Sequence, residues 1–223
     1  MCIRDSTQGD HSVYARLQER EMPLVIVNGA IEGSGIAAVS TDDRDATVTA
    51  YEYLRDLGHE RIGFVTGPSI YVPVQRKLDG FRSAAAAAGV GADETEHRIA
   101  ESTFTLEGGA AGTRRLLDRD VTGIIAASDM MALGAIRAVR ERGLEVPGDV
   151  SVVGYDDTDL MRFTDPPLTT IRQPVEQIAD HIATEILAQI GGRAPDVHET
   201  LFAGELIARS SAARCSTVVV RGR

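Results

Sequence analysis

Short apolar runs alternate with amphipathic segments along most of the chain. Residues 24–27 are apolar at every position, a pattern typical of a strand that is buried on both faces of a sheet. Residues 45–57 carry apolar side chains at helical spacing, and Gly58 follows where a glycine commonly ends a helix. The same alternation predicts the remaining elements. Strands are expected at 24–27, 61–66, 123–127, 151–155, 168–172 and 205–209, and helices at 45–57, 78–88, 106–117, 133–142 and 175–190.

Strands and helices that alternate at this spacing predict an α/β fold. Right-handed crossovers then give a mostly parallel sheet with helices on both faces. Ligands bind to such sheets at the carboxyl ends of the strands. The residues directly after each predicted strand are therefore the first place to look for a binding site.

Short polar side chains follow five of the predicted strands. These positions are Asn28, Gly67-Pro68-Ser69, Ser128-Asp129, Asp156-Asp157 and Gln173. Hydroxyl, amide and carboxylate groups at one edge of an apolar sheet suit the recognition of a small, neutral, hydroxyl-rich molecule by hydrogen bonds. We therefore expect a small-molecule site at this edge.

Each of these residues also has a purely structural interpretation. Asp129 precedes a predicted helix and could cap it. Asp156 and Asp157 could shape the turn after their strand, and Asn28 before Gly29 is a common turn pair. Another candidate, Phe104, could be an ordinary core aromatic. The pattern of residues leaves both interpretations open.

Composition and charge narrow the class of protein. The 223 residues (23.8 kDa) are 43% hydrophobic and 25% charged, which is ordinary for a globular protein. The 23 basic and 33 acidic residues give a net charge of −10, so the chain lacks the basic face that contacts to nucleic acid require. Its apolar runs are far shorter than the ~20 residues of a membrane helix, and no signal peptide is recognisable. We expect a cytoplasmic protein with no membrane partner, whose cysteines Cys2 and Cys215 are reduced.

Motifs of catalysis and of cofactor or metal binding are missing from the sequence. There is no GxxxxGK[ST] phosphate loop and no GxSxG nucleophile elbow. Residues 33–38 match a loose GxGxxA, but they do not join a strand directly to a long helix, as a dinucleotide site requires. The five histidines show no spacing typical of metal ligands. We expect no catalytic residue, no metal and no cofactor.

An ordered series of longer motifs runs from about residue 23 to residue 211. It comprises 53–63, Gly67-Pro68, 77–81, 128–135, the stretch 143–157 that ends in Gly-Tyr-Asp-Asp, the stretch 167–174 with the sequence Pro-Leu-Thr-Thr-Ile-Arg-Gln-Pro, and 205–210. In order and spacing this series resembles the effector-binding region of the LacI/GalR family of bacterial transcriptional regulators.

The resemblance implies two similar α/β subdomains of the periplasmic-binding-protein type, joined by three crossings of the chain. Crossings are expected near Asp42-Asp43, near residues 171–173 and shortly before His198. The implied division is a non-matching or partial leader at 1–22, an incomplete N-terminal subdomain at 23–42 and 174–196, a C-terminal subdomain at 43–173 and 197–213, and a tail at 214–223. The family's DNA-reading headpiece has no counterpart here, so an N-terminally truncated regulator is expected.

The resemblance also implies roles for particular residues. Asp156 corresponds to a carboxylate that accepts hydrogen bonds from the effector, and Phe104 to an aromatic ring that stacks on it. Ser128 replaces a usual Asn, and Lys77 replaces a usual Arg, which removes a two-pronged donor. The ligand-binding residues implied in this way are Asn28, Tyr71, Gln75, Lys77, Phe104, Ser128, Asp156 and Gln173.

The function implied by the resemblance is allosteric rather than catalytic. A sugar, or a related polyol or nucleoside, would bind between the subdomains of a homodimer, which would contact operator DNA only through the missing headpiece. Residues 161–165 are a candidate dimer surface or an ordinary solvated loop. Two other classes are a periplasmic sugar-binding protein of an ABC transporter, which would need an export signal, and a small α/β enzyme, which the motif search disfavours.

Overall fold

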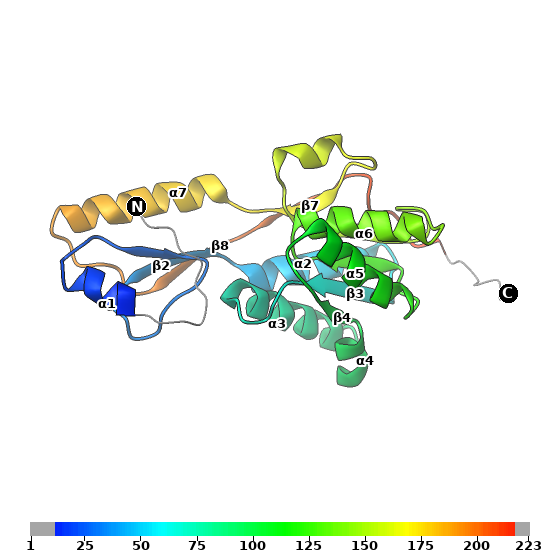
Figure 1. Cartoon of the computed structure of the whole chain (residues 1–223), viewed down its shortest axis with the longest axis horizontal. Coiled ribbons are helices and arrows are strands. Elements are labelled where there is room, and N and C mark those ends of the chain that lie inside the picture. The colour runs from blue at the N-terminus through cyan, green and yellow to red at the C-terminus, as the bar shows by residue number, and fades with distance from the viewer. Residues whose placement is uncertain (1–11, 217–223) are drawn as a thin grey trace.

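The computed structural model describes residues 12–216 (Figure 1). Its strands are β1 (Val25–Val27), β2 (Ala37–Thr41), β3 (Ile62–Thr66), β4 (Ile99–Glu101), β5 (Gly123–Ala126), β6 (Ser151–Asp156), β7 (Thr169–Arg172), β8 (Glu199–Phe202) and β9 (Glu205–Ile207). Its helices are α1 (Ser12–Gln18), α2 (Asp43–Asp56), α3 (Val72–Ala87), α4 (Ala92–His97), α5 (Leu106–Leu117), α6 (Asp129–Glu141), the short 3₁₀ helix η1 (Asp159–Phe163) and α7 (Val175–Ile190).

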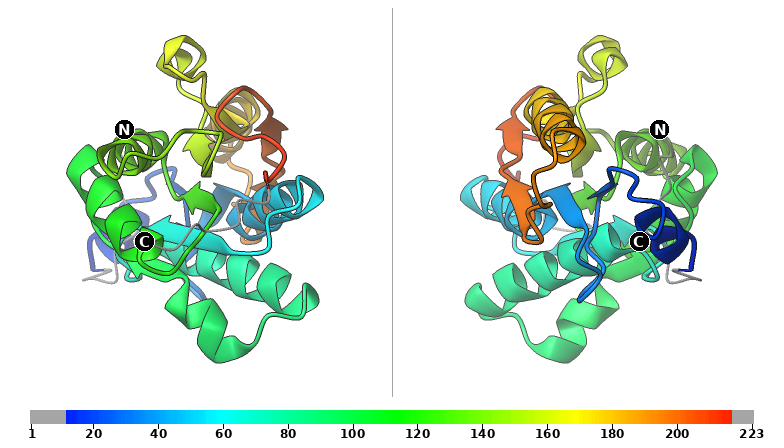
Figure 2. Two further views of the ribbon diagram at one scale, coloured as in Figure 1. Left: turned by 90° about the vertical axis from the view of Figure 1, so that its right-hand side faces the viewer. Right: turned by 90° about the vertical axis from the view of Figure 1, so that its left-hand side faces the viewer.

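The strands form two sheets, which lie at opposite ends of the long axis (Figure 1). Figure 2 shows the molecule from each of these two ends. The larger sheet has the order β4-β3-β5-β6-β7-β9, and all its pairings are parallel except β7 with β9. The smaller sheet has the order β1-β2-β8 and is entirely parallel. The α/β fold with mostly parallel sheets, predicted from the alternation of elements, is confirmed. We call the larger sheet with α2–α6 and η1 the large unit, and the smaller sheet with α1 and α7 the small unit.

Local sequence signals explain why the elements of the large unit begin and end where they do. The side chain of Asp42 caps α2 by accepting a hydrogen bond from the backbone N–H of Asp45 at 3.0 Å. Gly58 follows the end of α2 with φ of +88°, a conformation that glycine adopts at little cost. Helix α5 has the bounds expected from its periodicity. Apolar spacing and end signals are therefore sufficient to locate these elements.

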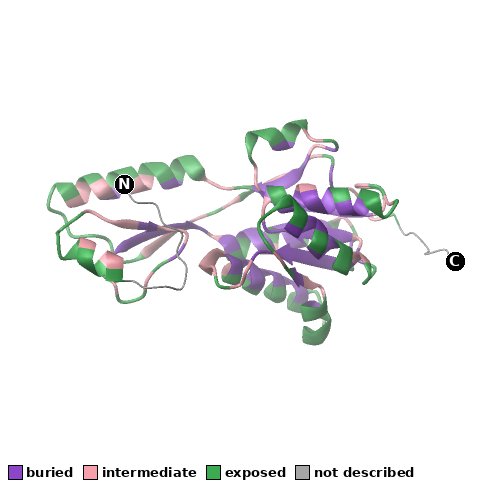
Figure 3. Cartoon of the chain, in the orientation of Figure 1, coloured by how far each residue is buried: buried purple, intermediate pink, exposed green. Residues whose placement is uncertain are grey.

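The core of the large unit is deep and continuous (Figure 3). Its largest fully buried side chains include Tyr51, Leu54, Phe64 and Phe81. The ring of Phe81 lies between the other two aromatic rings, with centroids 5.4 Å from Tyr51 and 5.3 Å from Phe64. Such packing fixes the positions of the strands, and hence of the residues at their carboxyl ends.

The small unit has a much smaller core. Its cluster of buried apolar residues consists of Ile26, Ile36 and Ala38, with Tyr14 of α1 packed against it. Helix α7 contacts both β1 and β2 (Figure 1). Residues 12–22, which the sequence assigned to a leader, therefore contribute α1 to the small unit; residues 1–11 and 217–223 lie outside the described part of the chain.

The chain passes between the two units three times. The first passage follows β2 at Asp42, and the second follows β7 at Gln173-Pro174. The third lies between Phe202 and Glu205, not shortly before His198 as expected. The reason is that β8 pairs with β2 in the small sheet, a pairing that the sequence pattern did not reveal.

Some elements were not predicted, and none of the described helices could cross a membrane. Strands β2, β4 and β8 and helices α1, α4 and η1 are short or mixed in polarity, so they carry weak periodic signals. The longest helices of the described residues, α3 and α7, have 16 residues each, and neither is both long and apolar enough to span a bilayer.

Candidate functional site

The carboxyl ends of strands from both sheets meet around Gln173. Its side-chain N–H donates to Oδ1 of Asp156, at the end of β6, across 2.6 Å. Its side-chain oxygen accepts a hydrogen bond from the hydroxyl of Thr41, at the end of β2, across 3.0 Å. One amide therefore ties the small sheet to the large one. We call Thr41, Asp156 and Gln173 the junction.

Asp156 has an unusual backbone conformation and an unusual acidity. Its backbone φ angle is +118°, in a region that residues other than glycine rarely adopt. Burial raises the pKa of Asp156 above its ordinary value, while the hydrogen bond from Gln173 and the positive charge of Lys77 oppose that shift. Strained backbone and a desolvated carboxylate are features that cluster at binding sites.

The neighbouring Asp157 has a structural role. Its carboxylate forms ion pairs with Arg172 at 2.7 Å and with Arg209 at 2.6 Å, and only 4% of its side chain is exposed. These pairs fix the turn after β6 to the strands beside it. The sequence left open whether the two aspartates shape a turn or bind a ligand; the structure gives them different surroundings.

The prediction that Asp129 caps a helix is wrong. Ser128 is the N-cap of α6, and its hydroxyl accepts a hydrogen bond from the N–H of Met131 at 3.3 Å. Asp129 is buried in the first turn, where its carboxylate accepts hydrogen bonds from the hydroxyl of Thr170 at 2.7 Å and from the backbone N–H of Thr158 at 2.9 Å. Burial raises the pKa of Asp129 to about 6, with a smaller upward contribution from the charge of Asp156 and downward contributions from these hydrogen bonds.

Lys77, a candidate ligand contact, lies in a buried polar cluster. Its ammonium is 2.8 Å from Oδ1 of Asp43 and 3.7 Å from the centroid of the Tyr155 ring. The hydroxyl of Tyr155 donates to the same carboxylate oxygen at 2.6 Å. Because Asp43 begins α2 directly after the first passage, the cluster fixes that passage to β6.

Two aromatic candidates lie together after the carboxyl ends of β3 and β4, at the same edge of the large sheet as Asp156 but farther from β7. The ring of Phe104 rests directly on Gly67, so any side chain at position 67 would collide with it. Tyr71 packs edge to face against Phe104, with centroids 6.3 Å apart. Phe104 is 41% exposed, so the core interpretation of this residue is wrong. Strand β3 ends at this pair and lies two strand spacings from β6, which is roughly 10 Å.

The remaining candidates lie on either side of the junction. Asn28 adopts φ of +62° at the end of β1, next to Gly29, whose N–H donates to the hydroxyl of Ser40 at 2.9 Å. The turn interpretation of Asn28 therefore describes its backbone, and its side chain is half-buried. Gln75 is exposed at the start of α3 and donates to the carbonyl of Ser69 at 3.0 Å.

The structure adds residues that the sequence analysis did not select. Thr41 belongs to the junction, and Asp43 and Tyr155 complete the buried cluster around Lys77. Thr41 ends a strand that was not predicted, so the rule of reading past each strand could not find it. Asp43 was noted only as a crossing, because an acid in the first turn of a helix is usually explained by its favourable interaction with the helix dipole.

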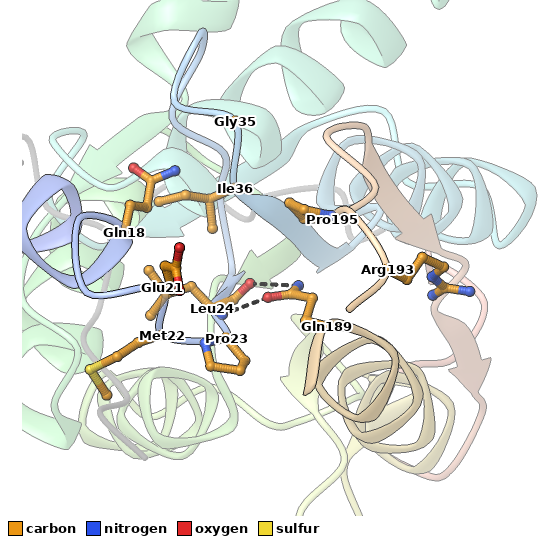
Figure 4. Close-up of a pocket in the computed structure, with 10 residues that line it drawn as sticks. All are labelled: Gln18, Glu21, Met22, Pro23, Leu24, Gly35, Ile36, Gln189, Arg193 and Pro195. Carbon is orange, nitrogen blue, oxygen red and sulfur yellow. Dashed lines mark hydrogen bonds between the residues drawn. The ribbon is translucent and has the colours of Figure 1, made fainter. Parts of the chain in front are cut away.

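Two cavities in the described part of the chain are lined by residues away from the junction. One, of about 250 Å³, lies at the opposite end of the small sheet, where Gln189 bonds both the N–H and the carbonyl of Leu24 (Figure 4). Another, of about 560 Å³, is an open groove between α6 and Asp165. Among the described residues no group of three or more His, Cys, Asp or Glu side chains could hold a metal ion.

Known proteins are similar to this chain in both sequence and fold. The family model of the periplasmic binding protein-like domain matches residues 51–212. The chain is similar to the HTH-type transcriptional regulator MalR of Streptomyces coelicolor, with 46% identity over 213 residues, which is 95% of this chain and 62% of that protein. The chain thus spans about six tenths of the length of the curated relatives that it matches.

Solved structures show a similar arrangement of both units. A complex of the transcriptional regulator CelR with cellobiose superimposes with a TM-score of 0.82 at 34% identity, covering 91% of this chain and 63% of that one. A LacI family transcriptional regulator from Enterococcus faecium with bound ribose gives a TM-score of 0.84 at 28% identity, covering 93% of this chain and 77% of that one.

Proposed function

The chain belongs to the LacI/GalR family of transcriptional regulators, within their periplasmic binding protein-like domain, and on this premise we propose that it binds a small sugar-like effector at the junction of its two units. The observation that carries the proposal is the hydrogen-bonded series Thr41–Gln173–Asp156, which joins the two sheets where their strands end. A ligand that hydrogen-bonds to Asp156 competes directly with the contact that links the units.

The chemistry of the surrounding residues favours a neutral molecule rich in hydroxyl groups. Asp156 offers a partly desolvated carboxylate, an acceptor for hydroxyl donors. Phe104 offers an exposed aromatic face on the same sheet edge, suited to the C–H face of a sugar ring. Cellobiose and ribose, named in the titles of two similar structures, belong to this class. In addition to Asp156 and Phe104, the proposed ligand contacts include Asn28 and Gln173.

We propose an allosteric mechanism rather than catalysis. The small and large units would be the two subdomains, and the effector would favour one relative orientation of them. If that orientation changes operator affinity by some factor, operator DNA must change effector affinity by the same factor. With a net charge of −10, this chain is poorly suited to contact DNA itself, so we assign operator binding to a separate DNA-binding headpiece. We propose a cytoplasmic location, as for a regulator that binds DNA. The transporter alternative is not favoured, because the relatives of this chain are named transcriptional regulators.

A homodimer is the second part of the proposed function. Leu160 and Phe163 of η1 are 62% and 74% exposed, whereas Met161 between them is buried. Apolar side chains displayed in this way are suited to an interface between two copies of the chain. Sedimentation of the protein with Phe163→Asp, next to the parent protein, tests this: the substitution should yield monomers, and an unchanged oligomeric state would contradict the assignment.

The effector proposal is tested by titration with a panel of sugars, polyols and nucleosides that includes cellobiose and ribose. A ligand present at 100 times its dissociation constant raises the free energy of unfolding by about 2.7 kcal/mol, which thermal melting detects. Asp156→Asn should abolish this shift, whereas Asp159→Asn, whose side chain is 99% exposed three residues away, should leave it unchanged. An undiminished shift in Asp156→Asn would remove the junction from the binding site.

A further inference from the structure

A second contact, separate from the junction, joins the two units. Arg76 of α3, in the large unit, reaches Glu199 of β8, in the small unit. Its two terminal nitrogens donate to the two carboxylate oxygens at 2.9 and 2.6 Å. The side chains are only 24% and 16% exposed. A bidentate ion pair at this degree of burial is held in a fixed geometry, unlike a solvated ion pair on the surface.

The same carboxylate continues into the small unit. The hydroxyl of Ser40 donates to Oε1 of Glu199 at 2.6 Å, and it accepts the hydrogen bond from the N–H of Gly29. Gly29 is the second residue of the turn that carries Asn28. Three consecutive interactions therefore connect α3 of the large unit to this turn of the small unit.

The electrostatics of Glu199 are consistent with a charged pair. Burial by itself would raise the pKa of Glu199, but the hydrogen bonds from Arg76 and Ser40 and the positive charge of Arg76 outweigh it, and the pKa is lowered. The carboxylate is therefore ionised at neutral pH and pairs fully with the guanidinium.

The pair lies at a distance from the passages that connect the two units. Glu199 lies opposite Ala38, three residues before the Thr41–Phe202 pair that borders the passages between the units. At about 3.3 Å per residue, this is roughly 10 Å from the passages. A rotation of one unit about the passages moves Arg76 and Glu199 apart much more than it moves Gln173 and Thr41.

We propose that Arg76 and Glu199 are positioning residues that clasp the two units together and hold the Asn28–Gly29 turn opposite the carboxyl ends of the large sheet. The clasp acts without a bound ligand, whereas its effect on ligand affinity rests on the proposed function. Breaking it lets the small unit rotate about the passages.

The test measures the distance between the units in the full 223-residue chain. Spin labels are attached at Val197→Cys, next to β8, and at Asp79→Cys on α3, after Cys2 and Cys215 have been replaced by Ser; both labelled side chains are exposed. Pulsed electron paramagnetic resonance then gives the distribution of label distances. The parent should show one narrow distance.

The variants are Arg76→Gln, Glu199→Gln and the double variant, with Glu96→Gln as the matched control. Glu96 forms a two-pronged pair with Arg82, at 2.6 and 3.1 Å, that lies wholly within the large unit. Each single variant should broaden the distribution and move it to longer distances, the double variant should add nothing further, and the control should match the parent. Unchanged distributions in both single variants, or effects that add in the double variant, would overturn the clasp. Urea unfolding of each variant confirms that it is folded during the measurement.

Titration of the same variants with cellobiose and ribose separates the clasp from the proposed function. We expect the single variants to bind the sugar about five-fold more weakly or worse, a coupling of the size that conformational linkage commonly produces. If neither sugar binds the parent protein, their choice as effector fails while the distance measurement still decides the clasp. If a sugar binds the parent and all variants equally, the role of the clasp in affinity is refuted although the effector site stands.

Discussion

The two units of the molecule differ in how firmly they are built. The large unit contains the largest fully buried side chains, among them Tyr51, Phe64 and Phe81, in one continuous core. The small unit has a cluster of three buried apolar residues. Firm packing holds the carboxyl ends of the large sheet in place, whereas the small unit depends on its links to the large one. The candidate binding residues therefore lie partly on a unit with an extensive core and partly on a unit with a small one.

This difference suits a protein that responds to a ligand. Asp156 is held at the end of β6, and the ion pair of Asp157 with Arg172 fixes the turn that follows. Asn28 lies on a turn that is linked to Glu199 through the hydroxyl of Ser40. A ligand that contacts both units selects among orientations of the small unit without disturbing the core of the large unit.

The largest change in the free energy of unfolding is expected from removing an aromatic ring from the core of the large unit. Phe81→Ala should lower the free energy of unfolding by about 3–5 kcal/mol, because the ring fills the space between Tyr51 and Phe64. Urea unfolding measures the loss, and hydrogen exchange should show faster exchange throughout β3, β5 and β6.

The counterpart in the small unit is Ile26→Ala. It truncates one of the three buried members of the small cluster, and it should speed exchange only in β1, β2 and β8. Faster exchange across the large sheet in this variant would show that the two units unfold as one and would refute the contrast.

The next effect concerns the buried pair that fixes the first passage to the large unit. Lys77→Met leaves the Asp43 carboxylate buried without its cation, at a cost of roughly 3 kcal/mol. This is the lower end of the usual range, because the Tyr155 hydroxyl still donates to Asp43. The double variant Lys77→Met/Asp43→Asn should recover much of the loss in urea unfolding.

The exposed pair Arg82–Glu96 serves as its comparison. Glu96→Gln should change the free energy of unfolding by no more than about 1 kcal/mol, as is usual for ion pairs in contact with solvent. A loss in Lys77→Met as small as this would mean that the buried cluster does not secure the passage.

A smaller effect appears in the dependence of stability on pH. The folded protein keeps a proton on Asp129 up to about pH 6, whereas the unfolded chain releases it near the ordinary pKa of 3.8. Between these values the folded state binds more protons, so this group lowers the free energy of unfolding as the pH rises. The loss amounts to roughly 2–3 kcal/mol and is complete above pH 6.

Asp129→Asn removes this contribution while keeping the size of the side chain. The difference in stability between parent and variant, measured by urea unfolding from pH 4 to pH 7, should change in favour of the variant as the pH rises. A constant difference across this window would mean that Asp129 is ionised in the folded protein at pH 4.

Much of the fold of the large unit could be predicted from the sequence. Residues 62–66 and 123–126 are fully buried strands in a parallel sheet, and such strands are continuous apolar runs that periodicity detects. The small unit was harder, because β8 begins with the polar pair Glu199-Thr200 and pairs with a strand more than 150 residues earlier. No local pattern reports such a pairing.

The candidate site shows the same division. Reading past each strand found Asp156 and Gln173, which share a hydrogen bond. It could not show that Lys77 is buried against Asp43, since a lysine at helical spacing is usually solvated. Nor could it assign the cap of α6 to Ser128 rather than Asp129, because either side chain can accept the hydrogen bonds of a helix start.

The proposed function requires that one small molecule contacts both units at the same time. Hydrogen exchange of the backbone, with and without saturating cellobiose or a tighter-binding sugar of the panel, tests it most directly. We expect slower exchange at Asn28–Gly29 in the small unit and at residues 155–158 in the large unit, together and at the same sugar concentration. Protection confined to one unit, or to the cavity beside Gln189, would contradict it.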